Sequence, residues 1–269
     1  MKGDLPSNLG KCLKFSEDVR TYFSDDNKYV YKFTSFDNSD EYLLMKVAQS
    51  SYTLSPINYI QSDKWNCLIM PAYQEGDAFS LLENNEQNEQ NTKQIVYDVI
   101  QGLIHLKSLN VIHNDIKPEN ILLIRDKKTI HGIIADFGFA EILTKDENIN
   151  QIFSGTIFYA SPERLMGSSY TFNSDIWSVG VLMAVLLTNT MPYFGTIHEI
   201  IKDIYTKKII LPDNISPLAQ DLLNQLLCIN PKQRLSAAQA VQHPWFDDVD
   251  HTPPLYDGIY NLNNKTPDL

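Results

Sequence analysis

The chain has 269 residues, 43% of them hydrophobic and 20% charged, with a formal net charge of −11. Its length accommodates one large domain or two lobes, and its composition is ordinary for a globular protein. The acidic balance argues against a nucleic-acid or anionic-membrane surface, because such surfaces need excess positive charge. The three widely spaced cysteines fit neither a disulfide framework nor a zinc site, so a reducing compartment is expected.

The apolar segments of the chain are too short for a membrane span. The N-terminal residues lack the apolar stretch of a secretory signal peptide. The longest apolar run, residues 176–187, is much shorter than a bilayer is thick and predicts a buried core helix. We therefore expect a protein of the cytoplasm, with the nucleus as a second location.

The first part of the chain has the alternation typical of strands. Three stretches show it: residues 29–33, 42–47 and 66–70. Residues 37–40 between the first two have good turn composition. Residues 48–55 are rich in Ser, Tyr and Thr and precede a proline, which disfavours a helix. This part of the chain therefore predicts a β-meander.

The middle of the chain predicts a helix that leads into a compact polar loop. Thr92 is placed to cap a helix over residues 93–108, whose apolar side chains recur at helical spacing. The next two apolar runs flank a loop that carries Asp115, Lys117 and Asn120. This spacing lets one loop present a carboxylate, a cation and an amide to a single reaction centre.

The loop and two later motifs together resemble protein kinases. Residues 113–120 (HNDIKPEN) resemble the family's catalytic loop, His-Arg-Asp-Leu-x-x-x-x-Asn. Sixteen positions after Asn120, residues 136–138 (DFG) match the magnesium-binding element of the same family. Residues 155–163 (GTIFYASPE) are similar to the Gly-Thr-x-x-Tyr-x-Ala-Pro-Glu segment of Ser/Thr kinases. The resemblance extends over about residues 20–246.

The resemblance implies an α+β, bilobal protein-kinase-like fold with a small β-rich N-lobe and a larger, mainly α-helical C-lobe. The expected boundaries are residues 1–70 for the N-lobe, 71–76 for the hinge, 77–246 for the C-lobe and 247–269 for a C-terminal tail.

The resemblance also assigns roles in the catalytic loop. Asp115 would accept the proton of the substrate hydroxyl, and Lys117 would neutralise charge on the transferred phosphoryl group. Asn120 and Asp136 would supply oxygen ligands to magnesium. His113 is expected to be a scaffold residue. Structural roles fall to Asp175, which would brace the loop, and to an ion pair between Glu163 and Arg234.

The resemblance further implies a set of ATP-binding residues. They are Lys46 for the phosphates, Met70 as gatekeeper, Ala72 for adenine through its backbone, and Leu122 beneath the adenine. Asp77 has two interpretations. It contacts the ribose or a basic substrate residue, or it simply begins a helix, where a carboxylate suits the helix dipole.

The N-terminal part departs from the family at its phosphate loop. The family uses Gly-x-Gly-x-x-Gly, because backbone must approach the phosphates without a Cβ. Here no glycine occurs between Gly10 and Gly76. Residues 24–29 are aligned with the phosphate loop and contain two aspartates, whose charge would oppose phosphate.

A second departure concerns the regulatory helix, which in the family pairs a Glu with the strand Lys. No Glu lies between Lys46 and Glu75, so this helix is expected to be missing or reduced to a turn. Leu44 would stand where the family usually has a small Ala above the adenine, which narrows the pocket. The N-lobe is therefore predicted to be reduced.

The catalytic loop also departs from the family, because Asn114 replaces the usual Arg. In many kinases that Arg binds a phosphorylated activation loop through charge-assisted hydrogen bonds. Residues 147–153 lack the expected Thr or Ser as well. A non-RD kinase without phosphorylation control at this loop is predicted, with Thr144 and Ser154 as the remaining candidate sites.

Two functional hypotheses remain. The first is a Ser/Thr protein kinase that transfers the ATP γ-phosphate to a protein with magnesium; Lys117 favours Ser/Thr over Tyr members. Asp77 and Glu119 would favour basic residues before the acceptor, and an activating protein would replace the missing helix. The alternative is a pseudokinase that acts as a regulatory or decoy binding module. No nucleic-acid or membrane partner is expected, and the Asn- and Ile-rich composition suggests a viral protein acting in a host cell.

Overall fold

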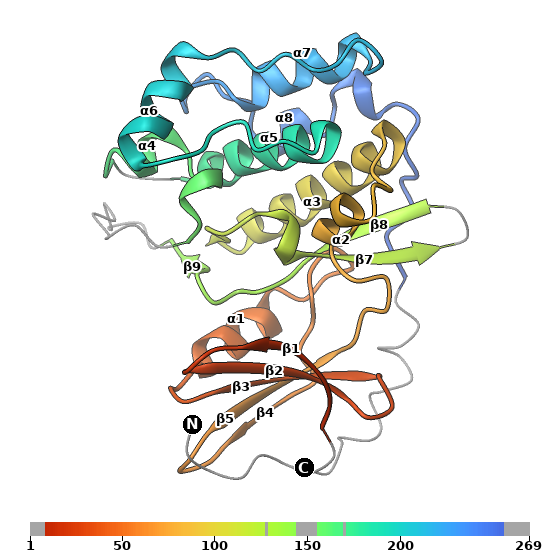
Figure 1. The fold of residues 1–269 in the computed structure, drawn as a ribbon, viewed down its shortest axis with the longest axis vertical. Coiled ribbons are helices and arrows are strands. Elements are labelled where there is room, and N and C mark those ends of the chain that lie inside the picture. Colours follow the sequence, from red (N-terminus) through yellow and green to blue (C-terminus); the bar gives the residue numbers. More distant parts are fainter. Residues whose placement is uncertain (1–8, 127–128, 144–154, 169–170, 256–269) are drawn as a thin grey trace.

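The chain folds into two lobes of different composition. A computed structural model describes residues 9–126, 129–143, 155–168 and 171–255. A small lobe, with one sheet and one helix, adjoins a larger lobe made mostly of helices (Figure 1). This arrangement confirms the α+β, bilobal fold that the sequence predicts.

The small lobe is built on a five-stranded antiparallel sheet in the order β1-β2-β3-β5-β4. Its strands are β1 (Leu9–Phe15), β2 (Val19–Ser24), β3 (Tyr29–Thr34), β4 (Asn58–Gln61) and β5 (Asn66–Pro71). Successive side chains of a strand point to opposite faces. One face packs into the main core through Val30, Leu68 and Met70. The other face holds a separate apolar cluster of Tyr31, Phe33, Cys67 and Ile69.

The strand predictions for the small lobe were confirmed twice and wrong once. Residues 29–33 and 66–70 lie in β3 and β5. Residues 42–47, predicted as a strand, instead belong to helix α1 (Ser39–Val47), and the prediction of a missing regulatory helix is therefore also wrong. Acidic residues in its first turn suit the helix dipole, and Met45 is fully buried. Leu44, which was predicted to lie above the adenine, belongs to this helix, so that prediction is wrong as well.

The segment aligned with the phosphate loop also lies elsewhere than predicted. Residues 24–29 form the β2–β3 hairpin turn, where the Ser24 hydroxyl accepts the backbone N–H groups of Lys28 and Tyr29 and donates to Asp26. The aspartates of this turn therefore shape a hairpin. The connection between β1 and β2 is the three residues 16–18, which also contain no glycine.

The large lobe is centred on two long helices, α3 (Glu89–Ser108) and α5 (Phe172–Thr188). Around them lie the shorter helices α2 (Ala78–Glu83), α4 (Pro162–Leu165), α6 (Ile197–Thr206), α7 (Pro217–Leu226) and α8 (Ala237–Ala240). The strands of this lobe are β6 (Val111–Ile112), β7 (Ile121–Asp126), β8 (Thr129–Ile134) and β9 (Glu141–Ile142). Short 3-10 turns occur at Pro118–Asn120, Ile157–Tyr159 and Pro244–Phe246. α5 is buried along most of its length, as its apolar sequence predicts. α3 begins earlier than predicted, with Asn88 rather than Thr92 as its cap.

The described start of the predicted tail is attached to the large lobe. Asp248 pairs with Lys93 of α3 at 2.6 Å, and the backbone N–H of Asp250 donates to Gln94 at 2.8 Å. Val249 is buried in the core. Among the helices in the described part of the chain, none has both the length and the apolar composition needed to cross a bilayer.

Candidate active site

The predicted catalytic loop lies between β6 and β7 and is held by α5. Both carboxylate oxygens of Asp175 accept backbone N–H groups, those of His113 and Asn114, at 2.8 and 2.9 Å. Burial raises the pKa of Asp175, while the backbone donors act in the opposite direction. Asp175 therefore fixes the path of the loop backbone, which confirms the bracing role predicted from the sequence.

Asp115 is the most densely hydrogen-bonded side chain of this loop. Its Oδ1 accepts both the backbone N–H and the hydroxyl of Thr156, each at 3.0 Å. Its Oδ2 accepts Lys117 Nζ at 2.6 Å and Asn120 Nδ2 at 2.8 Å. Because these donors come from two separate segments, the carboxylate has one orientation and remains charge-compensated by Lys117.

The segment that brings Thr156 to Asp115 depends on a glycine. Gly155 has a φ of 94°, which favours a residue without a Cβ. A Cβ there would lie 2.9 Å from the carbonyl oxygen of Asn114. Gly155 thus lets Thr156 approach the catalytic loop closely, and Thr156 Oγ1 also accepts Lys117 Nζ at 2.9 Å.

His113 has a structural role, as expected. Its Nδ1 accepts the backbone N–H of Asp115 at 3.3 Å, so the ring proton resides on Nε2, which lies 3.1 Å from the carbonyl oxygen of Ala135. The ring also packs edge-on against Phe137. Both ring nitrogens are therefore engaged in linking the catalytic loop to residues 135–137.

A lysine that the sequence analysis did not select lies where the small lobe meets the large lobe. Lys32 of β3 donates to both carboxylate oxygens of Glu41 in α1, at 2.7 and 3.0 Å. The same ammonium group pairs with Asp136 at 3.0 Å. The assignment of Lys46 is wrong, because that residue lies on the exposed side of α1 with its ammonium over the Tyr42 ring.

The three charges of this cluster, Lys32, Glu41 and Asp136, shift one another's pKa. Burial works against the charged form of Lys32, but Asp136 and Glu41 outweigh it and raise the pKa of the lysine. Burial likewise raises the pKa of Asp136, yet Lys32 dominates and the pKa falls to about 2. Burial raises the pKa of Glu41 in spite of Lys32. Asp136 is therefore ionised at every physiological pH.

The residues predicted for the adenine lie where the lobes join. Met70 lies near the end of β5, opposite Val30, and Leu122 lies in β7. The backbone N–H of Ala72 is already bonded to the carbonyl oxygen of Lys28 at 2.9 Å. Asp77 caps α2 by accepting the backbone N–H and hydroxyl of Ser80, each at 2.9 Å. Of the two interpretations of Asp77, the start of a helix is thus directly observed.

Asn114 replaces the family Arg and makes a neutral contact. Its Nδ2 donates to the carbonyl oxygen of Phe139 at 3.1 Å, and its backbone has a φ of 68°. Its carbonyl oxygen accepts Arg164 Nη1 at 2.8 Å. The predicted activation-loop residues, 147–153 together with Thr144 and Ser154, lie outside the described residues.

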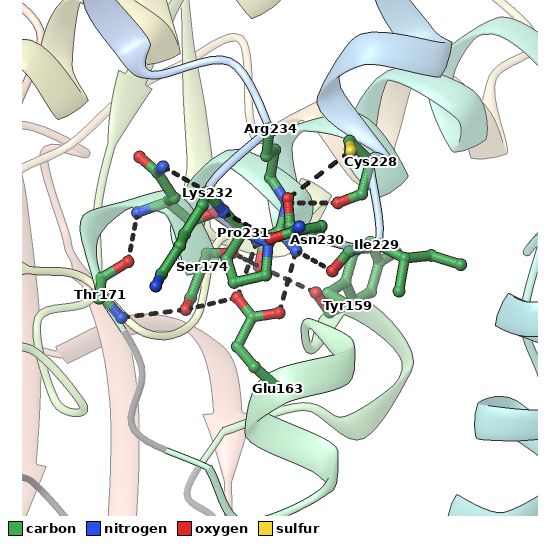
Figure 2. A network of polar contacts seen from close by, with 12 residues as sticks. Tyr159, Glu163, Thr171, Ser174, Cys228, Ile229, Asn230, Pro231, Lys232 and Arg234 are labelled. Atoms are coloured by element: carbon green, nitrogen blue, oxygen red, sulfur yellow. Dashed lines mark hydrogen bonds and ion pairs between the residues drawn. The ribbon is translucent and has the colours of Figure 1, made fainter.

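A buried ion pair supports the segment that follows Thr156 (Figure 2). Arg234 donates to both carboxylate oxygens of Glu163, at 2.8 and 2.9 Å, and to backbone carbonyls. Burial raises the pKa of Glu163, but the hydrogen bonds and charge of Arg234 prevail and lower it. Ser174 at the start of α5 also donates to Glu163. The predicted pair is confirmed; it joins α4 to the segment between α7 and α8, and Ser174 adds a link to α5.

Removing Arg234 is expected to destabilise the fold strongly. Arg234→Met leaves the Glu163 carboxylate buried without its partner, which costs about 3–5 kcal/mol. Arg125→Met provides the matched control, because its pair with Glu75 is about 40% exposed on both sides and such pairs contribute below about 1 kcal/mol. Urea unfolding measures both values, and equal losses would contradict the structural role of the buried pair.

Comparison with known proteins identifies the family. Residues 27–246 match the family described as Protein kinase domain. The chain belongs to the protein kinase family. This kinase is 35% identical over 203 residues to serine/threonine-protein kinase cds1 of Schizosaccharomyces pombe, covering 70% of the chain and 44% of the relative. It is 32% identical over 184 residues to myosin light chain kinase A of Dictyostelium discoideum, covering 66% and 62%.

A further relative is the calcium/calmodulin-dependent protein kinase type II alpha chain of Drosophila melanogaster, 31% identical over 192 residues, covering 69% of the chain and 36% of the relative. The chain thus spans less than two thirds of the length of each of these relatives.

The functional residues that the sequence analysis missed in this kinase are Lys32 and Glu41. The available signal was the strand-like stretch Tyr29–Thr34, which contains Lys32, followed nine positions later by a Glu at the start of an acidic turn. If the lysine-bearing strand were residues 42–47, the next Glu would be Glu75, which is too far along the chain to lie in a regulatory helix. The structure brings Lys32 to Asp136, 104 positions away.

Proposed function

We infer that this protein is a Ser/Thr protein kinase that transfers the γ-phosphate of ATP to a protein hydroxyl. The observation that carries this function is the presence of two clusters of charged and polar side chains where the two lobes meet. Asp115, Lys117, Asn120 and Thr156 form one in the large lobe. Lys32, Glu41 and Asp136 form the other across the two lobes.

Asp115 is the proposed acceptor of the substrate hydroxyl proton. A general base must be held within hydrogen-bond reach of that proton. Four donor contacts fix the carboxylate, and its side chain is nearly buried, so its orientation does not depend on solvent. Lys117 lies 2.6 Å from the same carboxylate and can neutralise charge on the transferred phosphoryl group.

Asn120 and Asp136 are the residues proposed to hold magnesium. Mg²⁺ prefers oxygen ligands, and Asp136 is ionised because the adjacent Lys32 outweighs the effect of burial and lowers its pKa to about 2. The Asn120 nitrogen is committed to Asp115, which turns its amide oxygen away from that carboxylate. The metal ion, when bound, offsets the negative charge of the phosphates.

Lys32 is the proposed lysine for the phosphates, in place of Lys46. Its ammonium group is oriented by Glu41 and directed at Asp136, beside the proposed metal ligands. Met70, Val30 and Leu122 would line the adenine site between the lobes. The helix that orients Lys32 is part of this chain, so an activating protein is not needed to supply it.

We expect protein substrates with basic residues before the acceptor, because an exposed acidic side chain lies near the catalytic loop. Glu119 is exposed and lies four residues after Asp115. The named relatives are serine/threonine, myosin light chain and calcium/calmodulin-dependent protein kinases, which supports a protein as the substrate class. Lys117 in the catalytic loop supports Ser/Thr as the acceptor.

Control by activation-loop phosphorylation is absent in this proposal. A phosphate group requires a cationic partner, whereas the Asn114 side chain is neutral and bonds the Phe139 carbonyl directly. The link between the catalytic loop and the residues after Asp136 is therefore permanent and does not depend on a modification.

Magnesium-dependent transfer by the unphosphorylated protein is the expected result. The protein is treated with phosphatase, freed of it, and incubated with Mg-ATP and a generic basic protein. Phosphate should appear on Ser and Thr of the substrate, and chelation with EDTA should abolish it. Thr144→Ala and Ser154→Ala should leave the rate unchanged, whereas a requirement for prior phosphorylation would contradict the proposed mode of control.

A pseudokinase remains the second candidate, because the β1–β2 connection contains no glycine. The same assay separates the two functions. Binding of nucleotide or of a protein partner without any phosphate transfer would support the pseudokinase.

A further inference from the structure

The β1–β2 turn is held to the sheet by hydrogen bonds. Its backbone and the Ser16 hydroxyl form a compact turn with Val19, with hydrogen bonds of 2.9–3.0 Å. Ser35, just after β3, donates its hydroxyl to Asp18 Oδ1 at 2.8 Å and its N–H to the Asp18 carbonyl. The turn is therefore bonded to the sheet and carries Glu17 and Asp18, whose charges repel phosphate.

The register of the sheet places a second lysine on the same face as Lys32. Lys14 of β1 pairs with Thr21 of β2, and Thr21 pairs with Lys32 of β3. Residues directly opposite in an antiparallel sheet share a face. The next residue, Tyr22, packs with the cluster on the other face, which places Thr21 on the same face as Lys32.

The row Lys14–Thr21–Lys32 therefore crosses three strands on the side of the sheet that faces the large lobe. Neighbouring strands lie about 4.8 Å apart, so the Lys14 backbone is roughly 10 Å from that of Lys32, within reach for two lysine side chains that meet one polyphosphate. Within the described part of the chain, Lys14 forms no ion pair.

The donors of Lys32 are already in use. Its ammonium group donates to both Glu41 and Asp136, so little of its hydrogen-bonding capacity is left for phosphates. A triphosphate brought to them needs further donors. The turn at residues 16–18 has no glycine to let backbone N–H groups approach the phosphates closely. Lys14 is the further cation on the same face of the sheet.

We propose that Lys14 binds the triphosphate tail of the nucleotide and replaces the backbone amides of a glycine-rich loop. The proposal rests on ATP as the substrate of the proposed kinase activity. It assigns the recognition of the phosphates to two side-chain cations on one sheet face, Lys14 from the edge strand and Lys32 from the centre.

The test compares a nucleotide with the corresponding nucleoside, which has no phosphates. Calorimetry or fluorescence titration gives the dissociation constants of Mg-ATP and of adenosine for the unmodified protein and for Lys14→Met. The Mg-ATP constant should rise roughly ten- to a hundredfold, since hydrogen bonds to charged groups are among the strong ones, whereas the adenosine constant should stay within about twofold. Lys14→Arg should retain most of the affinity for Mg-ATP.

The control is Lys28→Met, which removes an exposed positive charge from the same sheet at the β2–β3 turn. It should leave both constants unchanged, and thermal unfolding without ligand should be the same for both Met variants. Unchanged Mg-ATP affinity in Lys14→Met, or equal losses for Mg-ATP and adenosine, would overturn the role of Lys14. If the unmodified protein binds Mg-ATP through Lys14 but transfers no phosphate, the proposed activity fails and the binding role stands; if it binds no Mg-ATP, both fail.

Discussion

Asp115→Asn is expected to reduce phosphate transfer by roughly a thousandfold, because positioned general bases contribute about 10²–10⁴ to a rate. The replacement keeps the size of the side chain but changes its charge and its hydrogen bonding. The Asp115 Oδ2 position accepts both Lys117 Nζ and Asn120 Nδ2, and an amide nitrogen there would place donor against donor. If the amide turns over, the conflict moves to Thr156.

The measurement is the initial rate at saturating Mg-ATP and protein substrate, together with the affinity for Mg-ATP. The affinity should change little, because Asp115 contacts the acceptor hydroxyl rather than the nucleotide in the proposed mechanism. Asp115→Ala should reduce activity at least as much as Asp115→Asn, although it places no amide nitrogen against the donors of Lys117 and Asn120. Asp126→Asn at the far end of β7 is the control for a lost carboxylate. Rates within tenfold of the unmodified protein for both Asp115 variants would rule out the general-base role.

The large-lobe part of the site was predictable because its residues are close in sequence or belong to motifs with characteristic spacing. Asp115, Lys117 and Asn120 share one loop, and a short loop between two buried strands leaves few arrangements for them. The Glu163–Arg234 pair is distant in sequence, but each partner has its own motif. Burial then enforces the pairing, because neither charge can be buried alone.

The small-lobe part was not predictable because it depends on which strand lies next to which. Residues 42–47 are apolar enough for a strand, and over six residues strand and helix patterns cannot be separated. Tertiary contacts decide the outcome: the burial of Met45 and the Lys32–Glu41 pair stabilise a helix of nine residues. Short helices receive most of their stability from such packing rather than from propensity.

Lys32→Met is expected to lower kcat/KM by roughly a hundredfold, since a hydrogen bond to a charged group contributes about 1.5–3 kcal/mol and more than one is lost. Without the ammonium group, no cation lies between the carboxylates of Glu41 and Asp136. The pKa of Asp136, which Lys32 holds near 2, should then rise. Both the affinity for Mg-ATP and the free energy of unfolding at neutral pH should fall.

Lys46→Met is the matched control, because it removes a lysine from α1 that is exposed and paired with no carboxylate in the described structure. Surface changes of this kind alter stability by less than about 0.5 kcal/mol, and kcat/KM should stay within about twofold. The same substitution is therefore expected to lower kcat/KM strongly at Lys32 and to leave it nearly unchanged at Lys46. If Lys46→Met abolished activity and Lys32→Met did not, the phosphate-binding lysine would lie on the helix, and the contact of Lys32 with Asp136 would have no part in binding.

Glu41→Gln adds a third measurement, because it keeps Lys32 but orients it less firmly. The loss of kcat/KM should be smaller than for Lys32→Met, since the pairing of Lys32 with Asp136 at 3.0 Å is independent of Glu41.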